Sequence, residues 1–369
     1  MRILISPDKF KGSLDAALAA QSIRDGFAAV FPHAEYDLSP IADGGEGTGA
    51  IFMSSLGGEE VRTAAHDALG RPISAAYIWF PTRKLAVVEM SEASGLWRLT
   101  ASELNPLVAS TYGTGELMAD AIARGAETLC VTLGGSATND AGIGMAAALG
   151  WKFIDGTGNE MTPVPENFGM IHRIVPPETR WNCRVKALSD VNNPLLGSRG
   201  ATRIYAAQKG ADAAQMEILE EALLHVADLC QKHFGRDFRD APGSGATGGL
   251  GFGLLTFCDA TMEQGFEAVS ELLGLEGRIA RADLVITGEG RLDAQSLHGK
   301  GPAEVARIAR RHNRPVIAFA GAVSGTFPDF DACIPIADGP LTLDESRSRA
   351  AELLRIAAER AAHLIKISL

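Results

Sequence analysis

The sequence predicts an α/β protein in which a Rossmann-like domain with a parallel sheet carries an inserted second α/β domain with a mixed sheet. Three observations support this fold class. Short apolar runs alternate with amphipathic helical stretches along most of the 369 residues. Glycine is abundant, with 41 residues, as expected where many tight turns join strands to helices. Residues 61–90 contain three strand-like runs with no helix between them, which predicts an antiparallel region.

The elements can be justified in order along the chain. The first is a buried strand at Arg2–Ser6, and the amphipathic helix after it has Ser13 as its expected N-cap. The antiparallel strands of residues 61–90 come next, followed by a helix at Gly115–Ala123. Long helices with one apolar stripe are predicted at two places, Ala213–Phe234 and Leu343–Ile367. Further buried strands are expected at Thr128–Leu133, Val185–Leu188, Leu284–Thr287 and Val316–Ala320.

The order of these elements predicts how the chain divides into domains. The two ends of the chain read as parallel βαβ units, and the antiparallel strands lie between them. We therefore expect residues 1–64 and 284–369 to build the discontinuous Rossmann-like domain. Residues 65–283 would form the inserted domain.

Composition excludes several classes of protein. The net charge of −11 argues against a protein that binds nucleic acid or an anionic membrane, because both depend on basic surface. No stretch of 18 uninterrupted apolar residues occurs, so no membrane span is expected. The five cysteines form no CxxC pair, which disfavours a zinc ribbon or a disulfide framework. With no export signal recognised at the N-terminus, a cytoplasmic location is expected.

Two glycine-rich segments are candidates for binding phosphate. The first, residues 134–144, follows a predicted strand and opens a helix, so its backbone N–H groups could meet an anion. The alternative is a tight turn with ordinary capping. The second, Pro242–Gly253, could wrap a nucleotide in the same way or be a plain loop. The candidate nucleotide contacts are Gly134, Gly135, Ser136, Thr138, Asn139, Gly245, Gly248 and Gly249.

Carboxylates follow three of the predicted strands. They are Asp190, the pair Glu289 and Asp293, and Asp43. A carboxylate at a strand end can hold Mg²⁺ or accept a proton, although an N-cap or turn role is about equally common for any single one.

Cations occur in similar places. Lys9 follows the first strand and is the best candidate for an anion contact. For Lys209 and Arg291 a solvated surface role is at least as well supported.

Together these features indicate phosphoryl transfer, because glycine loops, carboxylates and lysines are its recurring parts. No GxSxG or HExxH segment supports a hydrolase. A nicotinamide-dependent oxidoreductase would need GxGxxG after the first strand, where SPDKFKGS stands instead. A non-catalytic ligand-binding protein would have little use for carboxylates beside glycine loops.

The motifs also resemble a known family. PDKFKGS, IADGGEGT, GGSATNDAGIGMAAALG, SDVNNPLLG, PGSGATGGLG and ITGEGRLDAQSLHGKGP occur in order within residues 1–320 and are similar to the bacterial glycerate kinases of the glycerate 2-kinase type. The resemblance implies phosphorylation of D-glycerate by ATP, with Mg²⁺, to 2-phosphoglycerate. Formation of 3-phosphoglycerate and another small hydroxy acid as substrate are the alternatives.

Individual roles follow as hypotheses. Asp190 would accept the proton of the glycerate hydroxyl, with Asp43 next in line. Lys9 would hold the glycerate carboxylate or a transferring phosphate. Glu289 or Asp293 would hold Mg²⁺, directly or through water.

Overall fold

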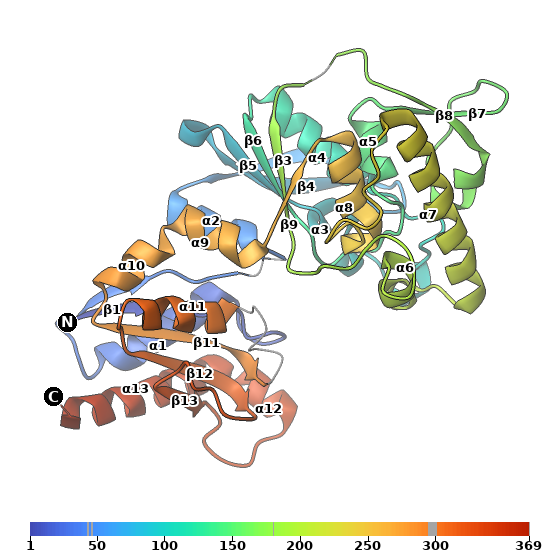
Figure 1. The fold of residues 1–369 in the computed structure, drawn as a ribbon. Helices are drawn as coiled ribbons and strands as arrows, with labels where there is room; N and C mark the ends of the chain where they lie inside the picture. The colour runs from blue at the N-terminus through green and yellow to red at the C-terminus, as the bar shows by residue number, and fades with distance from the viewer. Residues whose placement is uncertain (43, 46, 180, 294–300, 369) are drawn as a thin grey trace. The chain divides into compact units, whose positions relative to one another are not determined.

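The computed structural model describes residues 1–42, 44–45, 47–179, 181–293 and 301–368. The chain divides into two compact units (Figure 1). The terminal unit comprises Met1–Asp43 and Phe266–Leu369, and the central unit comprises Gly44–Gly265. The predicted fold class is confirmed: both ends of the chain build a parallel-sheet unit, and the segment between them builds a unit with a mixed sheet.

Both unit boundaries lie earlier in the chain than the expected 64/65 and 283/284. Helix α2 (Thr48–Leu56) packs against the central sheet, and strand β3 (Glu59–His66) pairs with β4 (Pro72–Phe80) at its edge. On the return, α9 (Gly265–Leu273) and α10 (Leu275–Arg281) already contribute to a core of the terminal unit. The predicted boundaries followed the strand pattern and missed these short flanking helices.

The terminal unit has a five-stranded parallel sheet in the order β13-β12-β11-β1-β2. Helices α1 (Ala16–Ala28) and α13 (Ala350–Ser368) pack on one face, and α10 and α11 (Gly301–Arg311) pack on the other. Both faces are therefore covered, as parallel sheets require. The strands are β1 (Arg2–Ile5), β2 (Glu35–Leu38), β11 (Leu284–Leu292), β12 (Val316–Val323) and β13 (Ala332–Pro335).

Two helices in this unit differ from the prediction, one at its N-cap and one by a break in its middle. The N-cap of α1 is Asp15, whose Oδ1 accepts a hydrogen bond from Leu18 N at 2.7 Å. Ser13 instead donates its hydroxyl to Phe10 O within the preceding turn. The predicted helix Leu343–Ile367 is two helices, α12 (Leu343–Ser348) and α13, because the backbone of Arg349 leaves the helical region at φ −101° and ψ 10°.

The central unit has a six-stranded sheet in the order β10-β9-β6-β5-β4-β3. Strands β3, β4 and β5 (Leu85–Glu89) are antiparallel, which confirms the prediction for residues 61–90. The neighbours β6 (Thr128–Thr132), β9 (Arg184–Leu188) and β10 (Thr261–Glu263) run parallel to β5. A separate two-stranded sheet is formed by β7 (Lys152–Asp155) and β8 (Ile171–Val175).

Helices surround the central sheet, and the longest of them, α7 (Ala213–Phe234), has the predicted bounds (Figure 1). The others are α2, α3 (Ser91–Ser94), α4 (Tyr112–Ala123), α5 (Ile143–Ala148), α6 (Ala201–Tyr205) and α8 (Ala246–Phe257). Short 3-10 helices occur at Pro81–Arg83, Leu96–Arg98, Ala101–Glu103, Pro165–Met170 and Ala207–Lys209.

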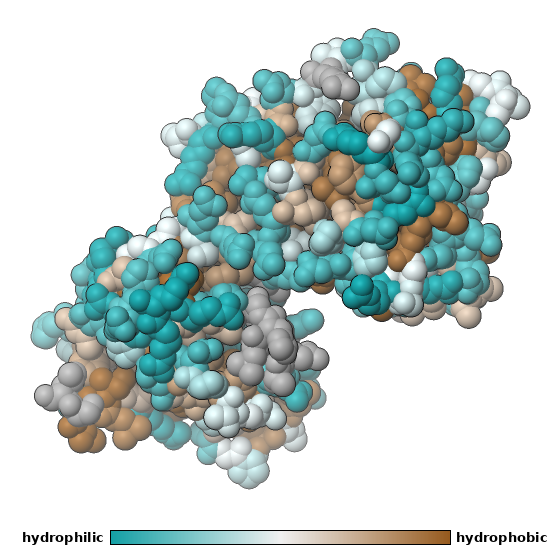
Figure 2. Space-filling view, in the orientation of Figure 1, coloured by the Kyte–Doolittle hydropathy of each residue, from teal (hydrophilic) through white to brown (hydrophobic). Residues whose placement is uncertain are grey.

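Each unit has its own hydrophobic core. The central core includes Tyr77 from β4, Phe153 from β7 and Phe252 from α8, all buried. The two faces of the terminal sheet bury Ile3 on one side and Leu4 on the other. Figure 2 shows that hydrophilic side chains cover most of the visible surface. None of the helices in the described part of the chain is both long enough and apolar enough to span a bilayer.

Candidate active site

The loop after β6 is fixed by backbone hydrogen bonds to the segment Ser94–Leu96. Gly135 O accepts a hydrogen bond from Leu96 N at 2.8 Å, and Ala137 N donates to Ser94 O at 2.9 Å. Gly135 adopts φ +66°, a conformation that glycine tolerates without strain. Among the described residues, the N–H groups of Gly134, Gly135 and Ser136 have no acceptor. These three amides are therefore available to a ligand anion.

Further along the same loop, the buried carboxylate of Asp140 accepts several hydrogen bonds. It accepts hydrogen bonds from Thr111 N at 2.7 Å, Thr111 Oγ1 at 2.8 Å, Gly142 N at 3.1 Å and Gly144 N at 3.2 Å. Burial raises the pKa of Asp140, and these hydrogen bonds oppose the rise. The first amides of α5 thus serve internal capping, which was the alternative interpretation for this part of the segment.

In the second glycine-rich segment, glycine allows two stretches of backbone to touch. A Cβ on Gly248, which has φ +70°, would lie 2.0 Å from Thr138 O. A Cβ on Gly249 would lie 2.8 Å from the Cα of Ala141, and one on Gly245 would lie 2.1 Å from Pro194 O. Real side chains do not approach this closely, so packing alone requires glycine at these three positions. Their contact with a nucleotide stays a prediction.

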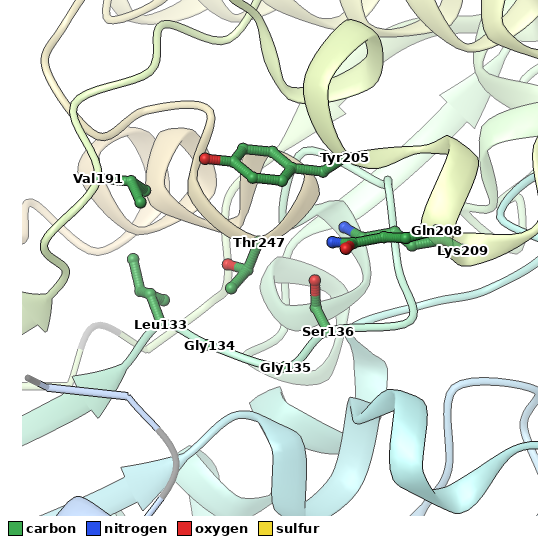
Figure 3. A pocket seen from close by; sticks show the side chains of 9 residues that line it. All are labelled: Leu133, Gly134, Gly135, Ser136, Val191, Tyr205, Gln208, Lys209 and Thr247. Carbon is green, nitrogen blue, oxygen red and sulfur yellow. The ribbon is translucent and has the colours of Figure 1, made fainter. Parts of the chain in front are cut away.

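A pocket of about 140 Å³ lies where the two segments meet (Figure 3). The amide-bearing residues Gly134–Ser136 form one wall, and the opposite wall comes from the chain around α6 and the 3-10 turn that follows it. Figure 3 shows the polar ends of Gln208 and Lys209 directed toward the middle of the pocket. Its lining residues are Leu133, Gly134, Gly135, Ser136, Val191, Tyr205, Gln208, Lys209 and Thr247.

Thr247 is a strained residue in this lining. Its backbone has φ +52° and ψ 44°, the left-handed region that a β-branched residue rarely adopts. Its Oγ1 is buried and has no hydrogen-bond partner among the described residues. The same holds for Thr138 Oγ1 and Asn139 Oδ1 on the neighbouring loop. Unsatisfied buried polar atoms are rare in folded proteins, and a group of three beside a pocket indicates a place for a polar ligand.

Lys209 is the cation of the pocket, and its side chain is only 1% exposed. Its Nζ donates to Thr138 O at 2.6 Å. Burial lowers the pKa of Lys209 to about 7, and the nearby charge of Asp140 opposes this only in part. From the sequence, a solvated surface role for Lys209 was at least as well supported. The available signal of burial was its small, apolar flank, Ala206 and Ala211.

Asp190, the predicted base, lies two residues after the end of β9 and is exposed. Its Oδ1 accepts a hydrogen bond from Gly265 N at 2.8 Å. The next residue, Val191, lines the pocket, whereas Asp190 is not among the lining residues.

In the terminal unit, candidate residues gather at the carboxyl ends of β1 and β11. Beyond β1 the chain stays hydrogen-bonded to β11, since Asp8 N donates to Gly288 O at 2.8 Å. Lys9 N donates to Asp8 Oδ1 at 2.6 Å. Glu289 follows Gly288 and is buried. Lys9, Asp8 and Glu289 thus share the edge of the sheet at which open α/β sheets bind ligands.

The two predicted magnesium ligands lie at different depths of this edge. Glu289 is within β11, whereas Asp293 follows its end and pairs with Arg291 at 3.1 Å. Four residues of extended chain separate their Cα atoms by up to about 13 Å. In the part of the chain that the structure describes, no three His, Cys, Asp or Glu side chains converge as a metal site. One carboxylate with water and phosphate oxygens would still suit Mg²⁺. Asp43 lies outside the described residues.

A two-unit α/β chain with a glycine-walled polar pocket, and with carboxylates at strand ends, has the features of an enzyme that acts on a small anionic ligand. Comparison with known proteins makes the class specific. A sequence model of the glycerate kinase family matches residues 3–366. The chain belongs to the glycerate kinase family.

Individual relatives agree with this assignment. The chain is 40% identical to a glycerate kinase of Bacillus subtilis, over 100% of this chain and 98% of that protein. It is 41% identical to glycerate 2-kinase of Escherichia coli, over 88% and 86%. A crystal structure of a Salmonella typhimurium LT2 protein described as glycerate kinase 2 superposes with a TM-score of 0.90 at 37% identity, covering 100% of this chain and 99% of that one.

Proposed function

We propose that this protein transfers the γ-phosphoryl group of ATP to the 2-hydroxyl of D-glycerate and so forms 2-phosphoglycerate. The observation that carries the proposal is the 41% identity to a protein named glycerate 2-kinase over most of both chains. The pocket between the two glycine-rich segments supports it, because its available amides and buried cation suit anionic reactants.

The test is a turnover assay on the purified protein with ATP, Mg²⁺ and D-glycerate. ADP should form in proportion to D-glycerate consumed, and phosphorus NMR should identify 2-phosphoglycerate as the product. L-glycerate and glycolate serve as controls for the substrate. A product spectrum of 3-phosphoglycerate would reassign the reacting hydroxyl, and no ADP release with D-glycerate would reject the proposal.

In the proposed mechanism, Asp190 accepts the proton of the attacking hydroxyl. Its place in the chain, next to the lining residue Val191, and its exposure to solvent support this role. The Gly135 and Ser136 amides receive the phosphate oxygens whose charge develops during transfer. Thr138, Asn139 and the glycines Gly245, Gly248 and Gly249 hold these amides in place by packing the two segments together.

Lys9 is proposed to neutralise a phosphate of ATP, and Glu289 or Asp293 to hold Mg²⁺ with water completing its shell. The bound ion supplies neutralisation of phosphate charge. The buried position of Glu289, beside Asp8 and Lys9 at one edge of the sheet, supports this placement. The test measures the Mg²⁺ dependence of turnover in Glu289→Gln and in Asp293→Asn. If both variants need Mg²⁺ as the wild type does and bind it with unchanged affinity, neither residue holds the ion.

We also propose a cytoplasmic location. All five cysteines are free thiols, the usual state in a reducing compartment. Fractionation of the native host cells with an antibody to this chain tests the location directly.

A further inference from the structure

We propose that Lys209 is the residue that binds the carboxylate of the acid substrate, at the wall of the pocket opposite Gly134–Ser136. The inference rests on the proposed function and goes beyond it, since it assigns a specificity-determining residue.

The first argument is size. The pocket has a volume of about 140 Å³. A buried cavity of about 150 Å³ in another protein accepts benzene, so a cavity of this volume takes a molecule of that size. D-glycerate is a molecule of similar size. A nucleotide is several times larger than this volume and would extend beyond it.

The second argument is charge. Lys209 is almost completely buried, and no carboxylate lies within ion-pair distance of it among the described residues. Its ammonium group has three protons, and the structure supplies one acceptor, Thr138 O. Buried cations are normally paired, because removing an ammonium group from water is costly. A ligand carboxylate would supply the missing partner.

The carboxylate of Asp140 is not a direct hydrogen-bond partner of the Lys209 ammonium group. Asp140 lies close enough to raise the pKa of Lys209, yet both of its oxygens are already engaged by Thr111, Gly142 and Gly144. The phenol of Tyr205, the other titratable group in the lining, has a pKa raised by burial.

The third argument is the arrangement of the walls. A kinase must hold the acceptor hydroxyl beside the transferring phosphate. In this pocket Gly134–Ser136, whose N–H groups have no acceptor among the described residues, line one part of the wall, and the polar end of Lys209 is directed toward the middle. A three-carbon acid lying between them would direct its carboxylate to Lys209 and its hydroxyls toward the amide wall. The single charge of Lys209 matches a carboxylate better than the roughly double charge of a terminal phosphate.

The experiment compares Lys209→Met with Lys232→Met, a matched change on the exposed end of α7. Loss of a charge-assisted hydrogen bond should raise the KM for D-glycerate by about 10- to 100-fold in Lys209→Met. The KM for ATP and the affinity for a non-hydrolysable ATP analogue should stay at the wild-type values. Lys232→Met should leave all of these unchanged.

Two measurements on the wild-type protein keep the test independent of any folding defect in the variant. Calorimetry should show that D-glycerate binds and that its uncharged amide, glyceramide, binds at least tenfold more weakly. The kcat/KM for D-glycerate should fall as the pH rises above about 7, because the ammonium then loses its proton. In Lys209→Met, which keeps Asp140 and Tyr205, this decline should be absent.

Other results would overturn the inference. An unchanged KM for D-glycerate in a folded Lys209→Met, or equal binding of glyceramide and D-glycerate to the wild type, would show that Lys209 does not read the carboxylate. Weakened binding of the ATP analogue alone would assign Lys209 to the nucleotide. If D-glycerate bound in a Lys209-dependent way without any ADP release, the proposed function would fail while the carboxylate assignment stood.

Discussion

At the scale of single residues, the structure allows the charge of Asp190 to be tested apart from its hydrogen bond. Its Oδ1 accepts from Gly265 N, and the amide oxygen of Asp190→Asn can do the same. The variant loses the negative charge and the ability to take a proton, and it can keep the hydrogen bond from Gly265 N. We expect kcat to fall by about 10²- to 10⁴-fold, the usual contribution of a general base. ADP release measures the rate, and calorimetry should show ATP binding unchanged.

Asp240→Asn is the control for this change, since Asp240 is an exposed aspartate of the same unit, outside the pocket lining. Near-wild-type turnover in Asp190→Asn would exclude Asp190 as the base and leave Asp43 as the next candidate.

The buried ammonium group of Lys209 should make the free energy of unfolding depend on pH. Burial lowers its pKa to about 7, well below the ordinary value, so between these values the unfolded chain holds a proton that the folded chain lacks. The free energy of unfolding should therefore rise with pH above about 7 on account of this group. Below pH 7 both states are protonated and the full cost of the buried ammonium is present. Each pKa unit corresponds to about 1.4 kcal/mol.

It follows that Lys209→Met should be more stable than the wild type at pH 6, by on the order of 3 kcal/mol after the lost hydrogen bond to Thr138 O is deducted. The gain should shrink as the pH approaches 10. Urea unfolding at pH 6 and pH 9.5 measures it. An equal difference at both values would contradict the lowered pKa.

At the scale of elements, Gly248 tests how tightly the start of α8 packs on the loop after β6. Gly248→Ala should destabilise the protein by about 3–5 kcal/mol, since it combines a positive φ with a Cβ lying 2.0 Å from Thr138 O. Gly235→Ala is a matched control, because Gly235 has nearly the same φ of +68° and open space around its Cβ. It should cost about 1–2 kcal/mol. Guanidinium unfolding compares the two, and equal losses would show that the contact yields without cost.

The same segments show what a sequence can and cannot predict. The position of glycines after a strand correctly marked the loop at Gly134–Ser136, because turns and open amides are local properties. That Gly248 faces Thr138 is a contact between distant parts of the chain, which no spacing reveals. Likewise, the N-cap of α1 depends on which of Ser13 and Asp15 meets the first free amide. The burial of Lys209 depends on the residues packed around it, which the sequence does not show. A lysine for which a surface role was expected is therefore buried in the lining of the pocket.

At the scale of the whole molecule, the predicted fold class is confirmed, and the two compact units of the structure divide at other residues than the expected boundaries. The alternation of strands and helices extends over many residues, so a misplaced end of one element does not change it. For this reason the inserted mixed-sheet unit could be predicted. A boundary depends on which unit α2 and α9 pack against, and the sequence of a short helix contains little information about its packing partner. The chain ends of the central unit meet, since a Cβ on Gly44 would lie 2.5 Å from the Cα of Gly265. Adjacent ends are what allow one unit to be inserted into another.

Because its ends meet and its core is its own, the segment Gly44–Gly265 should fold when produced alone. All residues of its core cluster, from Val61 to Ala260, lie within the segment, and so does every strand of its six-stranded sheet. We expect a single cooperative urea transition by circular dichroism, together with dispersed amide signals in NMR spectra. The segment should release no ADP from ATP and D-glycerate, because Lys9 and Glu289 belong to the terminal unit. The segment 65–283, cut at the boundaries expected from sequence, lacks residues Glu59–Ala64 of β3 and is the control; it should be less stable. A segment Gly44–Gly265 that stayed unfolded, in conditions where the full chain folds, would show that its core is not sufficient.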